Sequence, residues 1–133
     1  MATTQAIREW YLENEIEDEE ILVDNDLPGH YTFNCTSPSV SMCGILELDR
    51  RGNEMYLYNF HAYVTRVGIG TRLMQKALEV CDELQLPCIL IVTPGKLEIK
   101  YDDLLRFYLE FGFQETTRRM YCEPIFIRMP NLR

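Results

Sequence analysis

The feature that most constrains the fold is a glycine-rich turn that leads directly into an amphipathic helix. The turn is Arg66-Val67-Gly68-Ile69-Gly70-Thr71. After it, apolar residues recur at steps of four and three, the spacing of one helical face, at Ile69, Leu73, Ala77, Val80 and Leu84. The pattern predicts a helix over 70–84 and, after Pro87, a short buried strand over 88–93. A helix with one apolar stripe must pack on another layer, so this segment predicts an α/β fold.

Apolar segments before and after this unit predict the rest of the sheet. Segments 42–48 and 54–64 flank Asp49-Arg50-Arg51-Gly52-Asn53, a turn-forming composition, and so predict an antiparallel pair. Both alternating sets of 54–64 are largely nonpolar, which favours a central strand. The remaining predicted elements are helices over 3–15 and 101–111 and strands over 31–34, 113–121 and 125–129. We expect one domain over 1–133, with a mixed, mostly antiparallel sheet and helices on both faces.

Charge narrows the range of partners. The net charge is −8 and the pI is near 4.7, so the surface repels nucleic acid phosphates and attracts cations. Six carboxylates fall within 13–20, and they form either a solvated helix end or a wall that attracts a basic substrate. A nucleic acid partner is disfavoured, although several bases could share one face: Arg66, Arg72, Lys100, Arg106, Arg118 and Arg119.

The apolar runs and the cysteines exclude several classes of protein. The run 88–92 is far too short to cross a bilayer, and 1–20 lacks the apolar centre of a secretory signal. We therefore expect a cytoplasmic protein with no membrane partner. The five cysteines are an odd number without Cys-x-x-Cys spacing, which argues against a zinc ribbon and against a full disulfide framework. We expect reduced, mostly buried thiols and no metal.

The residue types in the glycine-rich turn suit the binding of a phosphate. Glycines let backbone N–H groups come close to a phosphate, and the start of a helix adds a dipole that favours negative charge. The alternative is a tight strand-to-helix turn that binds no ligand.

From 42 to 113, the order of hairpin, Gly-x-Gly turn, helix, buried strand, second helix and aromatic Gly-Phe resembles the GCN5-related N-acetyltransferase (GNAT) family. The aromatic motif is Phe107-Tyr108-Leu109-Glu110-Phe111-Gly112-Phe113. Segments 64–71, 86–87 and 103–108 are also similar to the small phage anti-CRISPR acetyltransferase. The resemblance implies an N-acetyltransferase that uses acetyl-CoA as co-substrate and forms no covalent enzyme intermediate.

The resemblance also assigns cofactor contacts. Backbone N–H groups of Arg66, Val67, Gly68, Ile69, Gly70 and Thr71 would hold the CoA diphosphate. Thr65 stands where the family prefers Arg or Gln, and Arg66 could supply the missing charge. Asn59, Phe60 and His61 match the strand segment that contacts the pantetheine arm and polarises the acetyl carbonyl. Tyr101 replaces a family Asn, so that contact is not carried over.

Catalytic roles follow from the same resemblance. Tyr108 stands where the family often places the acid that protonates the CoA thiolate, and its ordinary pKa of about 10 suits that role. The alternative is a core tyrosine. Glu54, fourteen residues before Gly68, matches a family base and would need a raised pKa, but it could equally be an exposed turn residue. His61 is the rival base, and a water is a third.

The expected acceptor is a primary amine, either a protein lysine on a basic surface or another cationic amine such as a polyamine. The alternative is a non-catalytic GNAT-fold module that binds a partner protein, with or without CoA. A monomer and a homodimer fit the sequence equally well.

Overall fold

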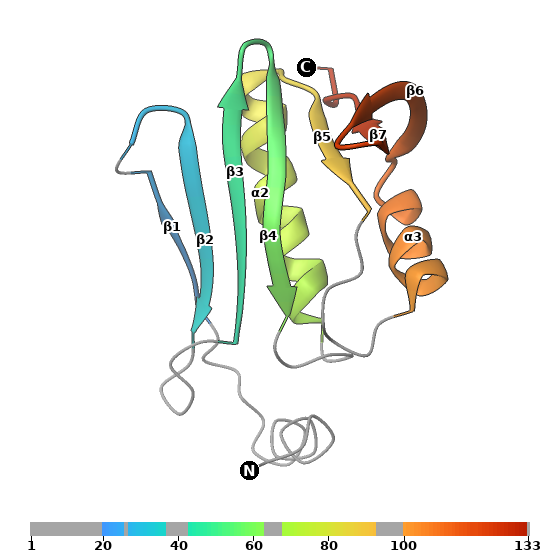
Figure 1. The fold of residues 1–133 in the computed structure, drawn as a ribbon. Coiled ribbons are helices and arrows are strands. Elements are labelled where there is room, and N and C mark those ends of the chain that lie inside the picture. The colour runs from blue at the N-terminus through green and yellow to red at the C-terminus, as the bar shows by residue number, and fades with distance from the viewer. Residues whose placement is uncertain (1–19, 26, 37–42, 63–67, 93–99, 133) are drawn as a thin grey trace. The chain divides into compact units, whose positions relative to one another are not determined.

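The computed structural model describes residues 20–25, 27–36, 43–62, 68–92 and 100–132 (Figure 1). Its strands are β1 (Glu20–Asp24), β2 (His30–Thr36), β3 (Gly44–Arg51), β4 (Glu54–Ala62), β5 (Cys88–Ile91), β6 (Gln114–Met120) and β7 (Glu123–Arg128). The helices are α2 (Ile69–Leu84) and α3 (Tyr101–Glu110). The seven strands form one sheet in the order β1-β2-β3-β4-β5-β7-β6. β4 and β5 are parallel, whereas β1–β2, β2–β3, β5–β7 and β6–β7 are antiparallel, which confirms the mixed, mostly antiparallel sheet.

The helix predicted over 3–15 lies outside the described residues. β1 was not predicted. It is a short edge strand in which both Leu22 and Val23 are 50% exposed, so it lacks the alternation of buried and polar residues that reveals a strand.

The chain forms two compact units. The first comprises Met1–Asp49 and Leu57–Val80, and the second comprises Arg50–Tyr56 and Cys81–Arg133. The largest fully buried side chains of the first unit are Phe33, Leu46, Leu48, Ile69, Leu73 and Met74, and those of the second are Met55, Leu90 and Phe113. The single domain over 1–133 stays a prediction.

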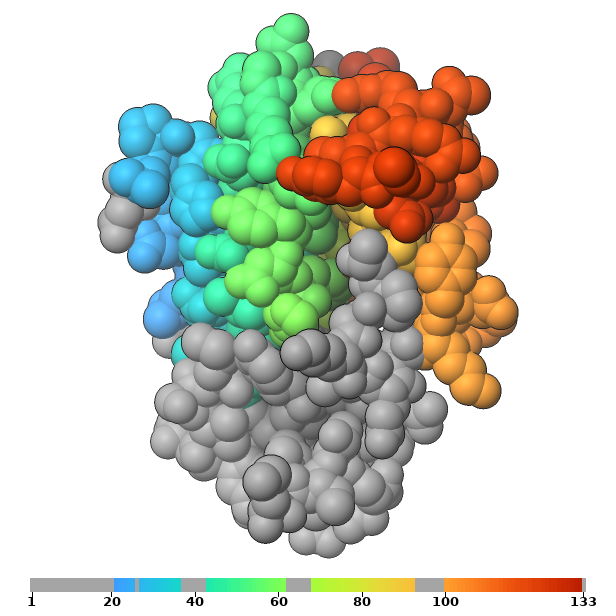
Figure 2. All heavy atoms as spheres, viewed as in Figure 1, coloured from blue at the N-terminus to red at the C-terminus, as the bar shows by residue number. Residues whose placement is uncertain are grey.

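In the first unit, α2 packs closely on β3 at Gly44. A Cβ atom on Gly44 would lie 2.9 Å from the carbonyl oxygen of His61, from Cγ2 of Ile69 and from Cδ1 of Leu73. Gly44 therefore lets the start of α2 approach the strands, as an interior strand glycine often does. Leu46 has the same strand parity as Gly44, so α2 covers the face that carries these residues. Figures 1 and 2 are viewed from the other side of β1–β4, whose side chains form surface there.

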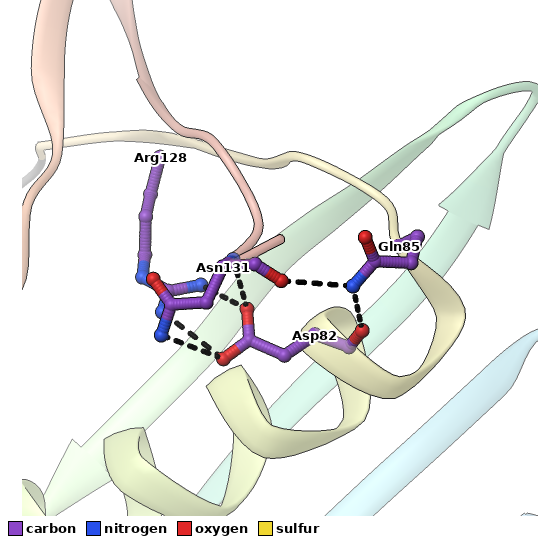
Figure 3. A network of polar contacts seen from close by, with 4 residues as sticks. All are labelled: Asp82, Gln85, Arg128 and Asn131. Atoms are coloured by element: carbon purple, nitrogen blue, oxygen red, sulfur yellow. Dashed lines mark hydrogen bonds and ion pairs between the residues drawn. The ribbon is translucent and has the colours of Figure 1, made fainter. Parts of the chain in front are cut away.

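In the second unit, a polar network joins the end of α2 to the C-terminal segment (Figure 3). The guanidinium of Arg128 donates to both carboxylate oxygens of Asp82, at 2.9 and 3.2 Å. The backbone N–H and the side-chain amide of Asn131 donate to the same carboxylate, at 3.0 and 3.3 Å. Gln85, which ends the helix with a φ of 54°, donates to the carbonyl of Asn131 at 2.9 Å.

The β6–β7 hairpin turns through Tyr121 and Cys122, whose φ angles are 54° and 65°. Positive φ at both central residues is what a type I′ turn requires, although Asn and Gly usually supply it. Neither described helix is both long and apolar enough to cross a membrane.

Candidate active site

The glycine turn forms the start of α2, whose first three amides lack an acceptor within the helix. Gly68 adopts a φ of 85°, and its carbonyl accepts the helical hydrogen bond from the N–H of Arg72 at 3.0 Å. The N–H groups of Ile69, Gly70 and Thr71 precede that bond, so they have no acceptor within the helix. The first turn contains no acidic residue. This is an arrangement that suits an anion.

Two residues assigned to the turn, Arg66 and Val67, lie outside the described residues. A different cation adjoins the turn. Nη1 of Arg72 lies 3.1 Å from the position of a Cβ atom on Gly68. The family motif did not indicate Arg72, but a helical step of four from Gly68 places its side chain over the first turn.

The β4 segment assigned to the pantetheine arm has an irregular backbone. Asn59 has a φ of 48°, a left-handed conformation that asparagine tolerates better than most residues. It is exposed, whereas Phe60 and His61 are half-buried. The β4–β5 ladder in the described part of the chain pairs Met55 with Cys88 and Tyr56 with Ile89, so it does not include this segment.

Tyr108 lies on α3 in the second unit and is only 5% exposed. The rings of Phe107 and Phe113 meet it edge-on, with centroids at 5.6 and 5.8 Å. Burial, and secondarily the thiol of Cys88, raise the pKa of Tyr108 well above its usual value. The phenol therefore stays protonated at physiological pH. It can donate a hydrogen bond to a thiolate, but it is a weaker acid than a free tyrosine.

The pKa of Glu54 is lowered, whereas a role as base would need it raised. Its carboxylate accepts two hydrogen bonds from the guanidinium of Arg118, one of them at 2.8 Å, and these bonds lower the pKa. The spacing from Gly68 pointed to Glu54, but it gave no sign of Arg118, the partner of Glu54 on β6. Glu54 is also the first residue of β4, whereas His61 is near its end. A paired carboxylate of low pKa holds a proton poorly, so its contacts do not favour a base.

The cysteines are mostly buried, as expected, and only Cys122 is exposed. Burial, with a smaller effect of Cys43, raises the pKa of Cys35 to about 11. A hydrogen bond with Cys81, together with burial, raises the pKa of Cys88. Protonated thiols are poor nucleophiles. Among the described residues, no group of three or more His, Cys, Asp or Glu side chains is arranged to hold a metal ion.

The predicted site residues that the structure describes are divided between the two units. Gly68, Ile69, Gly70 and Thr71 share the first unit with Asn59, Phe60 and His61, while Tyr108 and Glu54 belong to the second. Within the first unit, the carbonyl oxygen of His61 and the side chain of Ile69 both lie close to Gly44.

No family model matches this sequence, and no curated protein does. Solved structures with a similar fold include a GNAT-family acetyltransferase from Staphylococcus aureus Mu50, at 18% identity and a TM-score of 0.62, covering 77% of this chain and 69% of that one. The PaiA N-acetyltransferase of Thermoplasma acidophilum, in complex with coenzyme A, has 16% identity, a TM-score of 0.59 and coverages of 94% and 69%. The anti-CRISPR protein AcrVA5 has 23% identity, a TM-score of 0.56 and coverages of 62% and 87%. This chain therefore has the fold of the GNAT acetyltransferases.

Proposed function

We propose that this chain is an N-acetyltransferase that moves the acetyl group of acetyl-CoA to a primary amine. The observation that carries the proposal is the start of α2, where three helix-terminal amides follow the left-handed Gly68 and adjoin the guanidinium of Arg72. Amides and a cation at a helix start suit a diphosphate. The PaiA structure, which has the same fold, contains coenzyme A.

In this proposal, each set of residues has one task. The amides of residues 66–71, assisted by Arg72, hold the diphosphate. The backbone of residues 59–61 holds the pantetheine arm and polarises the acetyl carbonyl. The hydroxyl of Tyr108 donates a hydrogen bond to the sulfur as the C–S bond breaks. The acceptor is a lysine of a protein or a polyamine, consistent with the net charge of −8. We propose a cytoplasmic enzyme in one domain, as a monomer or homodimer.

Thermal unfolding tests the cofactor site. Acetyl-CoA at about 100 times its Kd should add about 2.7 kcal/mol to the free energy of unfolding, which is roughly 8–13 °C in Tm for a chain of this size. Gly68→Glu should abolish this protection, because its carboxylate would stand where the diphosphate binds and would repel it. Gly52→Glu is the matched control. Gly52 also has a positive φ, 63°, but it lies in the β3–β4 turn, so that variant should keep the full protection. An unchanged wild-type Tm at saturating acetyl-CoA would refute the proposal.

Tyr108→Phe tests the role of the phenol. We expect kcat to fall about 10²-fold, as for loss of a general acid, with the KM for acetyl-CoA unchanged. Initial rates of CoA release with a lysine peptide and with spermidine measure both constants. Tyr101→Phe, at an exposed position on the same helix, should leave both unchanged. If Tyr108 serves only the core, the variant will lower Tm and leave kcat intact. Saturable acetyl-CoA binding with no turnover of any amine would instead favour a non-catalytic binding module.

A further inference from the structure

The alternation of buried and half-buried side chains along β4 is interrupted at Asn59. Met55 and Leu57 are buried, while Tyr58 is half-buried. Because side chains two residues apart share a face of a regular strand, Asn59 would join Met55 and Leu57 in the buried row. It is instead exposed, and its φ is 48°. A left-handed residue changes the direction of a strand in this way, as a β-bulge does. Asn59 therefore re-aims β4 just before Phe60.

A carboxylate on the neighbouring strand holds the side chain of Asn59. Nδ2 of Asn59 donates a hydrogen bond to Oε2 of Glu47 at 2.7 Å. Glu47 lies on β3 between Leu46 and Leu48, which are buried on the face that α2 covers, so its carboxylate lies on the opposite face. The bond thus draws the amide of Asn59 away from the buried row. Its acceptor is charged, which makes it stronger than a bond between neutral groups.

Glu47 is itself held in place by β2. Its other oxygen, Oε1, lies 3.5 Å from the hydroxyl of Thr32 and 3.6 Å from Nε2 of His30. Thr32 is the partner of Glu47 in the β2–β3 register, and the Glu47 side chain is 20% exposed. Because these neighbours already limit its rotation, Glu47 loses less side-chain entropy when it accepts the bond from Asn59 than a fully exposed glutamate would.

The energetic balance favours control of the backbone by this bond. A left-handed conformation is unfavourable for residues other than glycine, and asparagine is among those that tolerate it best. The net value of a hydrogen bond to a charged group is of the same order as that cost. Glu47 can therefore decide whether Asn59 keeps its positive φ. Without this partner, Asn59 would be free to return to the extended conformation of a regular strand.

The backbone that follows Asn59 is the segment proposed to hold the thioester. The dihedral angles of Asn59 set the direction of the peptide groups of Phe60 and His61. The carbonyl oxygen of His61 lies 2.9 Å from the position of a Cβ atom on Gly44, close to the start of α2. Among the described residues, the β4–β5 pairs end at Tyr56. The local geometry at Asn59 therefore has a large share in aiming this segment.

We propose that Glu47 is a positioning residue of the transferase: through its hydrogen bond with Asn59 it holds the backbone of residues 59–61 in the conformation that binds the acetyl thioester. The inference rests on the proposed function. Glu47 contacts Asn59 rather than the acetyl group, so its effect reaches the reaction through the β4 backbone. Loss of the bond should weaken the contact with the acetyl carbonyl more than the contact with the diphosphate, which is assigned to residues 66–71.

A spectroscopic signature of the acetyl carbonyl tests the proposal without turnover. The probe is acetyl-CoA labelled with ¹³C at the carbonyl carbon and bound to the full chain. A hydrogen bond to the carbonyl oxygen moves the ¹³C resonance downfield, and we expect Glu47→Ala to lose most of that shift. Glu47→Gln keeps an oxygen that accepts from the Asn59 amide, so it should retain the shift. Glu115→Ala, at an exposed acid on β6, is the control and should retain it as well.

Asn59→Gly separates positioning from any other role of Glu47. Glycine adopts a positive φ without a partner, so Asn59→Gly combined with Glu47→Ala should regain the shift that Glu47→Ala loses. In initial rates of CoA release with spermidine, Glu47→Ala should lower kcat about tenfold and leave the Kd for acetyl-CoA within about twofold, and the double variant should recover kcat. A double variant as impaired as Glu47→Ala would overturn the proposal, because Glu47 would then act by another route.

Crystal structures of the wild type and of Glu47→Ala distinguish failure of this inference from failure of the transferase. We expect residue 59 to keep its positive φ in the wild type and to become extended in Glu47→Ala. A positive φ that persists in Glu47→Ala overturns the inference, even where acetyl-CoA is bound and turned over. If acetyl-CoA neither raises the Tm of the wild type nor gives a bound ¹³C resonance, the transferase is refuted, while the φ of residue 59 still decides whether Glu47 sets this backbone.

Discussion

Asp82→Ala is expected to remove about 3–5 kcal/mol from the free energy of unfolding, which corresponds to roughly 10–20 °C in Tm. The Asp82 carboxylate accepts hydrogen bonds from the two terminal guanidinium nitrogens of Arg128 and from the backbone and side-chain amides of Asn131. Arg128 is only 9% exposed. Alanine would leave its charge buried without this partner, and the cost of burying an unpaired charge exceeds the value of a surface ion pair. Urea unfolding followed by circular dichroism measures the change.

Two further variants separate this charge effect from loss of helix packing. Asp82→Leu combined with Arg128→Met removes both charges, and we expect it to cost clearly less than the sum of the two single changes. Glu79→Ala, at an exposed acid on the same helix, should change stability by less than about 0.5 kcal/mol. A loss below 1 kcal/mol for Asp82→Ala would mean that Arg128 remains solvated when its partner is gone.

Local periodicity predicted the elements that hold the core, because burial imposes a repeat on the sequence. Ile69, Leu73 and Ala77 form the buried stripe of α2 where the spacing placed it, whereas Leu84, at its end, is 38% exposed. The turn at Tyr121 and Cys122 carried no signal, since neither residue type favours positive φ. The Asp82–Arg128 pair could not be predicted either, because its partners lie 46 residues apart and no local pattern joins them.

In the candidate site too, local motifs predicted some features, whereas others depend on contacts between distant residues. Gly68 was indicated by a local motif, and the structure gives it the positive φ that only glycine adopts freely. The contacts of Glu47 with Thr32 and Asn59 depend on strand pairing, which a single sequence does not specify. The pKa of Glu54 depends on Arg118, which lies 64 residues later. The motif therefore predicted a backbone conformation, whereas the electrostatics of side chains could be read only from the fold.

Gly44→Val is expected to cost about 3 kcal/mol of stability and to weaken the protection by acetyl-CoA. The added Cβ would lie 2.9 Å from the carbonyl oxygen of His61 and from side-chain atoms of Ile69 and Leu73, closer than real Cβ contacts allow. One of these three atoms belongs to the backbone, which cannot rotate away as a side chain can. Overpacking of this kind usually costs 1–3 kcal/mol, and the branched side chain of valine places the cost at the upper end, about 3. Urea unfolding and the rise in Tm with acetyl-CoA measure the two effects.

The protection by acetyl-CoA should weaken because β4 and the start of α2 both lie against Gly44. Relief of the clash must shift the atoms that the Cβ meets, and two of these three atoms, in His61 and Ile69, belong to the proposed cofactor site. Gly52→Val is the control, because Gly52 has a positive φ of 63° but no atom within 4 Å of a Cβ. It should cost about 1–2 kcal/mol through backbone strain and keep the full protection. If Gly44→Val loses stability yet keeps that protection, the close approach at Gly44 serves packing alone, and the cofactor amides are positioned by another part of the turn.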